Sequence, residues 1–370
     1  MICACRKKEI RILVVTGSSG GHIFPALSLL DSLKNKAPDI QALLVLPRRS
    51  TRYHLGGLKY PLRYISFSPI KFSLGLSNIM SILRFFKGIT EELAVLLKFR
   101  PRIVVGFGSL ASLPLILFAR AGGRKTLIHE QNVIPGRANR LLVFFTNRIA
   151  LSFSASSNYL KCSRSKIVVT GNPLRQEMHP IDKVKARDYF GLSQDRLTIL
   201  VSGGSQGSHN INSGFLKMVS LLADKYRIQV IHLSGEDDYE IVRQQYQKIK
   251  VEARVFDFCS AMQYAYSASE LVISRAGATT IAELMLFKIP AFLVPYPYAY
   301  NHQLANARVL VDKGCAVIMN DLQFSVGQGQ EILENILGNS HELERMHNNY
   351  QGPDAAEAAG RLRDAVLALV

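Results

Sequence analysis

The sequence IRILVVTGSSGGH at residues 10–22 joins a short run of aliphatic, mostly β-branched residues to a turn that is rich in glycine. A second segment of the same kind, RLTILVSGGSQG, occupies residues 196–207. A strand that is buried on both faces of a parallel sheet reads as a nearly continuous apolar run. A glycine-rich turn that leads from such a strand into a helix is typical of a doubly wound α/β domain. We therefore predict two doubly wound domains.

Further apolar runs alternate with helical patterns along both halves of the chain. We expect strands at residues 41–47, 102–108, 125–131, 147–153, 166–173, 227–235, 253–258, 270–277 and 290–297, and a first helix near 24–35. This alternation predicts parallel sheets that helices cover on both faces. GNP at 171–173 interrupts a strand, so we predict an N-terminal domain at 1–172, a C-terminal domain at 173–352, and a final helix at about 353–370 that packs back on the first domain.

The composition of the 370 residues excludes a disordered chain, because 48% are hydrophobic and 20% are charged. Residues 1–173 hold 26 Lys and Arg against 6 Asp and Glu, a net charge of +20, whereas residues 174–370 hold 19 against 22, a net charge of −3. The basic half predicts an acidic partner: a membrane, a nucleic acid or a phosphate-rich ligand. No basic run is interleaved with aromatic residues, which disfavours nucleic acid. Five scattered cysteines indicate neither a zinc site nor a disulfide framework.

Polar residues follow the predicted strands of the first half. Gly20 and Gly21 begin a predicted helix, and their backbone N–H groups can bind an anion. His22 lies in the first turn of the same helix. HEQN at 129–132 follows another strand; it lacks the second histidine of a zinc motif, so we expect a loop that lines the ligand cleft. The alternatives are a histidine that only begins a helix and an ordinary turn.

The second half repeats this arrangement. Ser205 lies in a glycine-rich turn, and the amides of residues 278–280 open a helix and can bind phosphate. Glu283 stands further along that helix, where a carboxylate can accept hydrogen bonds from both hydroxyl groups of a ribose. The alternative is a glutamate that favours the start of a helix. The amides of Asn301, Gln303 and Asn306 are suited to the hydroxyl groups of a sugar.

Six motifs together resemble the MurG family of bacterial glycosyltransferases: GxxGGHxxPA, HEQN, GNPxR, GGSQG, SRAGAxTxxE and NHQxxNA, spread over residues 17–307. The resemblance implies the two-domain GT-B fold and an inverting transfer of N-acetylglucosamine (GlcNAc) from UDP-GlcNAc to the 4-hydroxyl of N-acetylmuramic acid (MurNAc) in undecaprenyl-diphospho-MurNAc-pentapeptide, known as lipid I. It also implies a role in peptidoglycan synthesis, cell shape and division. The location implied is the cytoplasmic face of the inner membrane, where other cell-wall synthesis proteins are further partners.

The resemblance also implies the site. UDP-GlcNAc contacts fall on Ser19, Gly20, Gly21, Asn132, Arg175, Ser205, Cys259, Ala278, Thr279, Thr280, Ile281, Ala282, Glu283 and Gln303. Arg175 would stabilise the leaving diphosphate, and His22 is the candidate general base. No metal or other cofactor is required by any motif. The chain departs from the family at Ser18 and Ser19 of the first loop, and at Ser109 and Leu110 after the third strand, where the family has glycine and tyrosine.

A segment at residues 72–102 predicts contact with an anionic membrane. Ile79, Leu83 and Phe86 recur at helical spacing, and the basic residues Arg84 and Lys87 lie beside them. The alternative is a helix whose apolar side faces the core. No apolar run reaches the roughly 20 residues of a membrane-spanning helix, so we expect a cytosolic or peripheral protein.

Other functions stay open at this point. One is a different UDP-sugar enzyme of the same fold, such as a transferase with another lipid acceptor or an epimerase. Another is a subunit without catalytic activity that binds a UDP-sugar and the membrane.

Overall fold

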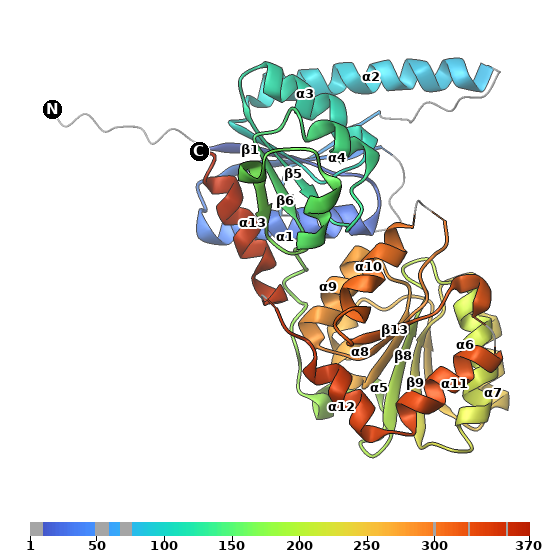
Figure 1. Cartoon of the computed structure of the whole chain (residues 1–370). Helices are drawn as coiled ribbons and strands as arrows, with labels where there is room; N and C mark the ends of the chain where they lie inside the picture. Colours follow the sequence, from blue (N-terminus) through green and yellow to red (C-terminus); the bar gives the residue numbers. More distant parts are fainter. Residues whose placement is uncertain (1–9, 49–58, 67–75, 299–300, 325, 353) are drawn as a thin grey trace. The chain divides into compact units, whose positions relative to one another are not determined.

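A computed structural model describes residues 10–48, 59–66, 76–298, 301–324, 326–352 and 354–370; the side chains of 76–82 and 326–328 lie outside this description. The chain forms two compact units (Figure 1). Unit 1 consists of Met1–Arg175 and Glu357–Val370, and unit 2 of Gln176–Ala356.

Unit 1 is built on a parallel sheet of seven strands in the order β3-β2-β1-β4-β5-β6-β7. The strands are β1 (Arg11–Val15), β2 (Gln41–Pro47), β3 (Leu62–Ile65), β4 (Ile103–Gly106), β5 (Lys125–Glu130), β6 (Arg148–Leu151) and β7 (Ile167–Val169). The α-helices are α1 (Gly20–Lys36), α2 (Leu76–Phe99), α3 (Leu113–Ala121), α4 (Arg137–Leu142) and α13 (Ala358–Leu367).

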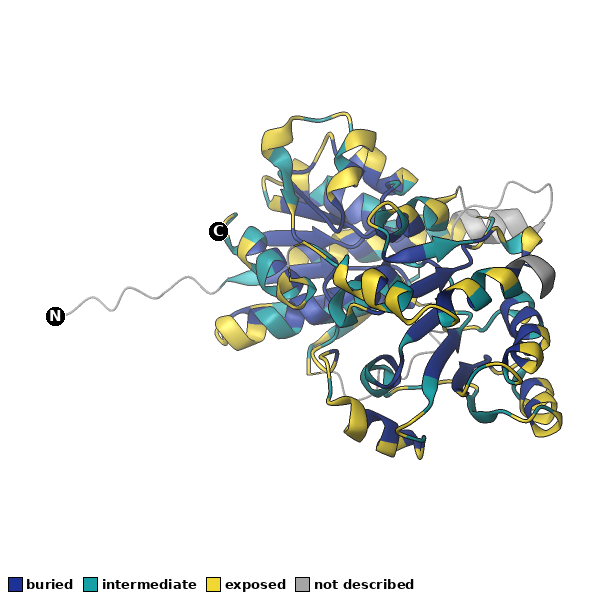
Figure 2. Cartoon of the chain, turned by 60° about the horizontal axis from the view of Figure 1, so that its bottom comes forward, coloured by how far each residue is buried: buried dark blue, intermediate teal, exposed yellow. Residues whose placement is uncertain are grey.

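The strand β1 shows how the apolar run produces two cores. Ile12 and Val14 belong to a cluster with residues of α1 and α13, whereas Leu13 and Val15 belong to a cluster with residues of α2 and α3. All four side chains are fully buried. Figure 2 shows that the strands consist largely of buried residues, whereas exposed residues lie mainly on helices and loops. Burying one such side chain contributes about 1.5–3 kcal/mol, so a continuous apolar strand is stable only between two layers of helices.

The C-terminal helix α13 is part of unit 1. Leu362 and Val366 are fully buried in the cluster that contains α1. The Nε of Arg361 donates a hydrogen bond of 2.9 Å to the carbonyl oxygen of Thr170.

Unit 2 is built on a parallel sheet of six strands in the order β10-β9-β8-β11-β12-β13. The strands are β8 (Leu197–Ser202), β9 (Ile228–Leu233), β10 (Glu252–Phe256), β11 (Leu271–Ser274), β12 (Ala291–Leu293) and β13 (Ala316–Ile318). The α-helices are α5 (Lys183–Phe190), α6 (His209–Leu222), α7 (Tyr239–Lys248), α8 (Met262–Ala268), α9 (Ala278–Phe287), α10 (His302–Val311), α11 (Val326–Leu337) and α12 (Ser340–Asn348).

The predicted fold class is confirmed, since both sheets are parallel and are covered by helices. Two edge strands, β3 and β13, were not predicted. β3 exposes Arg63 and Tyr64, so it carries no continuous apolar run. β13 is apolar but only three residues long, which is shorter than the runs from which strands were predicted. The helix α1 also begins four residues before the predicted start at Phe24, at Gly20.

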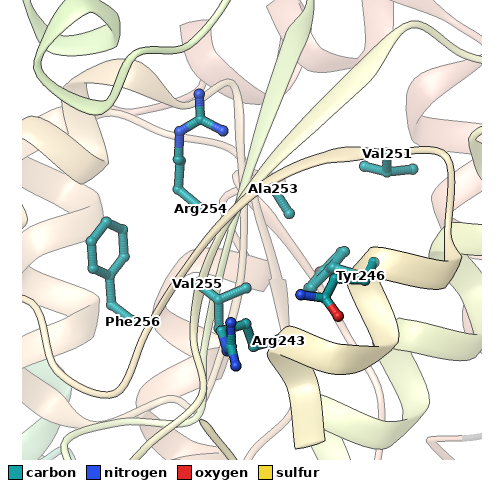
Figure 3. A pocket seen from close by; sticks show the side chains of 8 residues that line it. Arg243, Tyr246, Val251, Ala253, Arg254, Val255 and Phe256 are labelled. Carbon is teal, nitrogen blue, oxygen red and sulfur yellow. The ribbon is translucent and has the colours of Figure 1, made fainter. Parts of the chain in front are cut away.

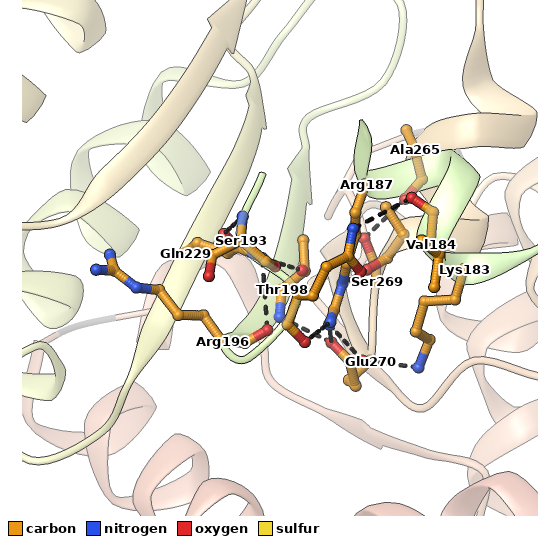
Figure 4. A network of polar contacts seen from close by, with 12 residues as sticks. Lys183, Val184, Arg187, Ser193, Arg196, Thr198, Gln229, Ala265, Ser269 and Glu270 are labelled. Atoms are coloured by element: carbon orange, nitrogen blue, oxygen red, sulfur yellow. Dashed lines mark hydrogen bonds and ion pairs between the residues drawn. The ribbon is translucent and has the colours of Figure 1, made fainter. Parts of the chain in front are cut away.

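A polar network holds the amino ends of the strands in unit 2 (Figure 4). The carboxylate of Glu270 accepts hydrogen bonds from Nη2 of Arg187 at 2.8 and 3.0 Å and from the backbone nitrogen of Thr198 at 2.7 Å. Arg187 is buried, and breaking such a pair by removing one partner costs about 3–5 kcal/mol. This network therefore stabilises the end of the sheet opposite the glycine-rich turns.

No helix within the described residues is long and apolar enough to cross a membrane.

The turn between β8 and α6 depends on glycine at position 207. Gly207 has a φ of +75°, and a Cβ added there would lie 2.1 Å from the carbonyl oxygen of Ser234. Gly204 has a φ of +91°, but an added Cβ would meet nothing within 4 Å. The two glycines thus share the left-handed backbone but differ in available space.

We predict that Gly207→Ala destabilises the protein more than Gly204→Ala. The left-handed backbone costs either alanine about 1–2 kcal/mol, and the clash with Ser234 adds about 1–3 kcal/mol at position 207 only. Urea unfolding of the full chain measures both changes. Equal losses in the free energy of unfolding would contradict the role given to Ser234.

Candidate active site

The first loop of unit 1 brings His22 to the end of β1. The Nδ1 atom of His22 lies 2.9 Å from Oγ of Ser19, within hydrogen-bond distance. Ser19 itself precedes α1 in extended conformation, and the backbone nitrogen of His22 donates to its carbonyl oxygen at 3.0 Å. Desolvation lowers the pKa of His22 to about 4, so the imidazole is neutral near pH 7. Gly20 is buried, whereas Gly21 is exposed at the start of the helix.

The HEQN segment was expected to form a loop, but its first two residues, His129 and Glu130, end β5, and only Gln131 and Asn132 follow the strand. The buried carboxylate of Glu130 accepts hydrogen bonds from the backbone nitrogens of Asn132 and Gly136, both at 2.9 Å, and from Nδ2 of Asn139 at 2.8 Å. His129 is also buried, and its Nε2 lies 3.1 Å from the carbonyl oxygen of Gly171. These two residues therefore hold the loop, and Gln131 and Asn132 remain as its candidates for ligand contact.

Residues from α1, from α4 and from the segment after β5 meet at Gly108, which follows β4. A Cβ added to Gly108 would lie 3.5 Å from Nε2 of His22, 3.6 Å from Nδ2 of Asn139 and 3.7 Å from Oε1 of Gln131. The ends of β1, β4 and β5 thus bring polar atoms to one small space, as the topology of a parallel sheet favours. The next residues depart from the family pattern: Ser109 has a φ of +71° and Leu110 is 52% exposed.

Arg175 is the last residue of the first segment of unit 1. Its guanidinium group lies 5.0 Å from the ring centre of Phe24 on α1. This contact is a cation–π interaction and orients the side chain beside the helix that carries His22.

In unit 2, Tyr266 orients the carboxylate predicted to bind ribose. The hydroxyl group of Tyr266 donates a hydrogen bond of 2.8 Å to Oε2 of Glu283, and Tyr266 is buried. The helix α9 begins after Gly277, so the amides of Ala278, Thr279 and Thr280 stand in its first turn. Ile281 and Ala282 are buried and pack inward. Tyr266 was missed by the sequence analysis because it carries no motif.

The remaining predicted residues of unit 2 differ in their surroundings. Ser205 is exposed in its glycine-rich turn, and Cys259 is partly buried between β10 and α8. Oε1 of Gln303 accepts hydrogen bonds from the backbone nitrogens of Ala276 at 3.2 Å and Tyr296 at 2.9 Å. Gln303 therefore supports the turn before α9 with its oxygen, a role that its motif alone did not indicate.

A pocket of about 340 Å³ lies beside the edge strand β10 (Figure 3). It is lined by Arg243, Tyr246, Gln247, Val251, Ala253, Arg254, Val255 and Phe256. None of these is a predicted site residue. Arg243 forms an ion pair with Glu240, and Arg254 shares the carboxylate of Glu252 with Arg196.

Metal binding was not expected from the sequence. Among the described residues, no group of three or more His, Cys, Asp and Glu side chains is arranged to hold an ion. Independence from metals and cofactors stays a prediction.

Comparisons with known proteins agree with the sequence resemblance. The model of the glycosyltransferase family 28 N-terminal domain matches residues 12–151, and that of the C-terminal domain matches residues 198–362. Curated UDP-N-acetylglucosamine–N-acetylmuramyl-(pentapeptide) pyrophosphoryl-undecaprenol N-acetylglucosamine transferases are similar along nearly their whole length. That of Thermodesulfovibrio yellowstonii is 38% identical over 322 residues (85% of this chain, 87% of the relative), and that of Bacillus subtilis is 31% identical over 357 residues (95% and 98%).

Solved structures share the fold. The crystal structure of Acinetobacter baumannii MurG matches with a TM-score of 0.79 at 23% identity, covering 97% of this chain and 99% of that chain. The S. aureus MnaA–UDP co-structure matches with a TM-score of 0.69 at 15% identity, covering 98% of each. The fold is that of the GT-B glycosyltransferases. Because family models match both units and relatives above 30% identity match nearly end to end, the chain belongs to glycosyltransferase family 28, among the N-acetylglucosaminyltransferases named above.

Proposed function

We propose that the chain transfers GlcNAc from UDP-GlcNAc to the 4-hydroxyl of MurNAc in lipid I, which yields lipid II for peptidoglycan synthesis. The observation that carries the proposal is the identity of 31–38%, nearly end to end, with relatives named for this transfer. A putative UDP-GlcNAc 2-epimerase from Listeria monocytogenes shares the fold at only 14% identity. The transferase function is therefore favoured over epimerisation.

In this proposal unit 2 binds the donor. Glu283, held by Tyr266, accepts hydrogen bonds from the ribose hydroxyls, and the uracil lies at Cys259 beside Phe258. The diphosphate lies at the first turn of α9, where amides and the helix dipole favour negative charge, with the hydroxyl of Ser205 as a further donor. Arg175 supplies a cation to the leaving group, and Gln303 supports the turn.

Unit 1 binds the acceptor and supplies the base. The acceptor 4-oxygen attacks C1 of GlcNAc, the bond between C1 and the UDP oxygen breaks, and UDP leaves with the electron pair. The hydroxyl proton moves to Nε2 of His22. A neutral imidazole is needed for this step, and the lowered pKa of His22 keeps it neutral. The amides of α9 stabilise the charge that develops on UDP.

We propose further that unit 1 lies on the cytoplasmic face of the bacterial inner membrane as a peripheral protein. On α2, Leu83 is 59% and Phe86 is 60% exposed, and Arg84 and Lys87 are exposed beside them. The buried side of this helix consists of other residues, such as Leu96, so the alternative of a core-facing apolar stripe is disfavoured. Ile79, the third predicted apolar contact, lies outside the described side chains.

Exposed Phe144 and Phe145 after α4 add apolar surface to unit 1. Apolar side chains among basic ones favour an anionic lipid surface. The basic charge of residues 1–173 acts in the same direction. We also propose that the chain contacts other cell-wall synthesis proteins at this membrane surface.

Our first prediction for this function concerns the donor. A charged hydrogen bond contributes about 1.5–3 kcal/mol, so Glu283→Ala should weaken UDP-GlcNAc binding roughly ten- to 150-fold. Isothermal titration calorimetry measures the dissociation constant. Glu240→Ala, at an exposed glutamate of α7, is the matched control and should leave it unchanged. An unchanged constant for Glu283→Ala would remove this residue from the donor site.

The second prediction concerns the base. His22→Ala should lower kcat by about 10²–10⁴ and leave donor binding intact. Because the pKa of His22 is lowered to about 4, wild-type kcat/KM should persist well below pH 6.5 and fall only as the pH approaches that lower value. A loss of kcat/KM centred near pH 6.5, or near-normal turnover of His22→Ala, would mean that another group takes the proton.

The third prediction concerns the membrane. Phe86→Asp with Arg84→Glu and Lys87→Glu should abolish sedimentation with phosphatidylglycerol vesicles, which wild type binds at low salt and releases at high salt. The matched control changes one apolar and two basic residues in the same way on the exposed side of α7 in unit 2: Ile241→Asp, Arg243→Glu and Lys248→Glu. This variant should bind the vesicles as wild type does. Two results would contradict the proposal: wild-type binding that does not depend on lipid charge and salt, or vesicle binding by the triple variant of α2.

A further inference from the structure

The contacts of the buried residue His129 determine which nitrogen of its ring carries the hydrogen. Its Nε2 lies 3.1 Å from the carbonyl oxygen of Gly171, and a carbonyl oxygen only accepts hydrogen bonds. Nε2 must therefore carry the hydrogen. Desolvation lowers the pKa of His129 to about 4, so the ring is neutral and its Nδ1 is an acceptor. Phe107 packs against the ring at 5.2 Å between ring centres and helps to hold its orientation.

This tautomer determines how the side-chain amide of Gln131 is turned. Because Nδ1 of His129 accepts, Gln131 must present its amino group, and its Nε2 lies 3.0 Å from that Nδ1. The same Nε2 also donates to the carbonyl oxygen of His129 at 3.2 Å. Both amide hydrogens are thus used, and Gln131 is buried. The oxygen Oε1 is directed away from His129 as a consequence.

The oxygen Oε1 of Gln131 borders the same space as the proposed base. A Cβ built on Gly108 would lie 3.7 Å from this oxygen and 3.5 Å from Nε2 of His22. Nδ2 of Asn139 borders the space as well, but its hydrogens are directed to Glu130 at 2.8 Å and to the carbonyl oxygen of His129 at 3.3 Å. Because Gly108 has no side chain, room for a group about the size of a methyl remains between these atoms, at ordinary van der Waals distances. Oε1 of Gln131, which has lone pairs available, and Nε2 of His22 therefore stand beside it.

We propose that Gln131 binds the acceptor sugar through Oε1, and that His129 is the positioning residue that turns the amide toward it. This inference rests on the proposed function. In MurNAc the oxygen on carbon 3 carries an ether, so the free hydroxyl group next to the reacting 4-hydroxyl is the one on carbon 6. Gln131 accepts the hydrogen bond of the 6-hydroxyl while the 4-hydroxyl faces Nε2 of His22.

The orientation of the amide is tested by nitrogen-15 NMR of the full chain with labelled histidine. We expect His129 to be neutral at pH 7 with its hydrogen on Nε2. A hydrogen on Nδ1 would mean that Gln131 presents its oxygen to His129, which overturns the proposal. This experiment needs no substrate, so its result is independent of the proposed transfer reaction.

The contact with the acceptor is tested by comparing a short-chain lipid I analogue with its 6-deoxy form. Wild type should lose about two- to twelve-fold in kcat/KM on the 6-deoxy form, the value of one neutral hydrogen bond. Gln131→Leu and the unbranched Gln131→Met should show the same two- to twelve-fold loss of kcat/KM on the full acceptor. Both variants should use the full and the 6-deoxy acceptor equally well, and their dissociation constant for the donor should be unchanged. Gln41→Leu, at an exposed position of β2, is the matched control and should retain the discrimination.

The role of His129 is tested by the same discrimination. His129→Leu should abolish the difference in kcat/KM between the full and the 6-deoxy acceptor. The double variant His129→Leu with Gln131→Leu should have the same ratio as the single variant, because His129 acts through Gln131. A purely structural role would lower the rates on both acceptors equally and leave their ratio unchanged. Variants at position 131 that still discriminate would overturn the proposal, whereas wild type that transfers to neither acceptor would refute the proposed function itself.

Discussion

Both sheets are parallel and lie between two layers of helices, and this arrangement decides where polar chemistry can occur. After Arg11, the strand β1 has no polar side chain, because each of its faces is buried in an apolar cluster. Polar groups are available only where strands end and the chain turns into a helix. His22, Gly108 and Gln131 follow three different strands, and the order of those strands brings them together. In unit 2 the same rule places Ser205 after β8 and the first turn of α9 after β11.

Much of this could be predicted from the sequence, because apolar runs and glycine turns are local signals. The strands of the sheet interiors were found this way. The edge strand β3 was missed because it carries polar residues, and the edge strand β13 because its apolar run is short. Motifs indicate the candidate site residues, but not the contacts that hold those residues in place. Glu130 satisfies its hydrogen bonds within its own loop, and Tyr266 orients Glu283 from another helix. Such contacts depend on the path of a loop or on the packing of two helices, so no spacing rule reports them.

The chemistry of the proposed base depends on burial rather than on a partner of opposite charge. Desolvation lowers the pKa of both His22 and His129, so both rings are neutral where most enzymes work. Because the ring of His129 is neutral, one of its nitrogens donates a hydrogen bond and the other accepts one. Because the ring of His22 is neutral, one of its nitrogens has a lone pair that can take up a proton. The departures at Ser19 and Ser109 lie in the loops around this pair. A hydroxyl in place of a threonine or a glycine keeps these loops polar, and Oγ of Ser19 is directed to the ring of His22.

The central claim is the transfer of a sugar to lipid I, and the release of UDP tests it most directly. UDP-GlcNAc and a short-chain lipid I analogue are incubated with the full chain, and UDP and the lipid product are both quantified. The account predicts UDP and a β-linked GlcNAc–MurNAc product in equal amounts, and no UDP when the acceptor is omitted. Binding of UDP-GlcNAc without any release of UDP in the presence of lipid I, or conversion of the donor into its epimer, would contradict it.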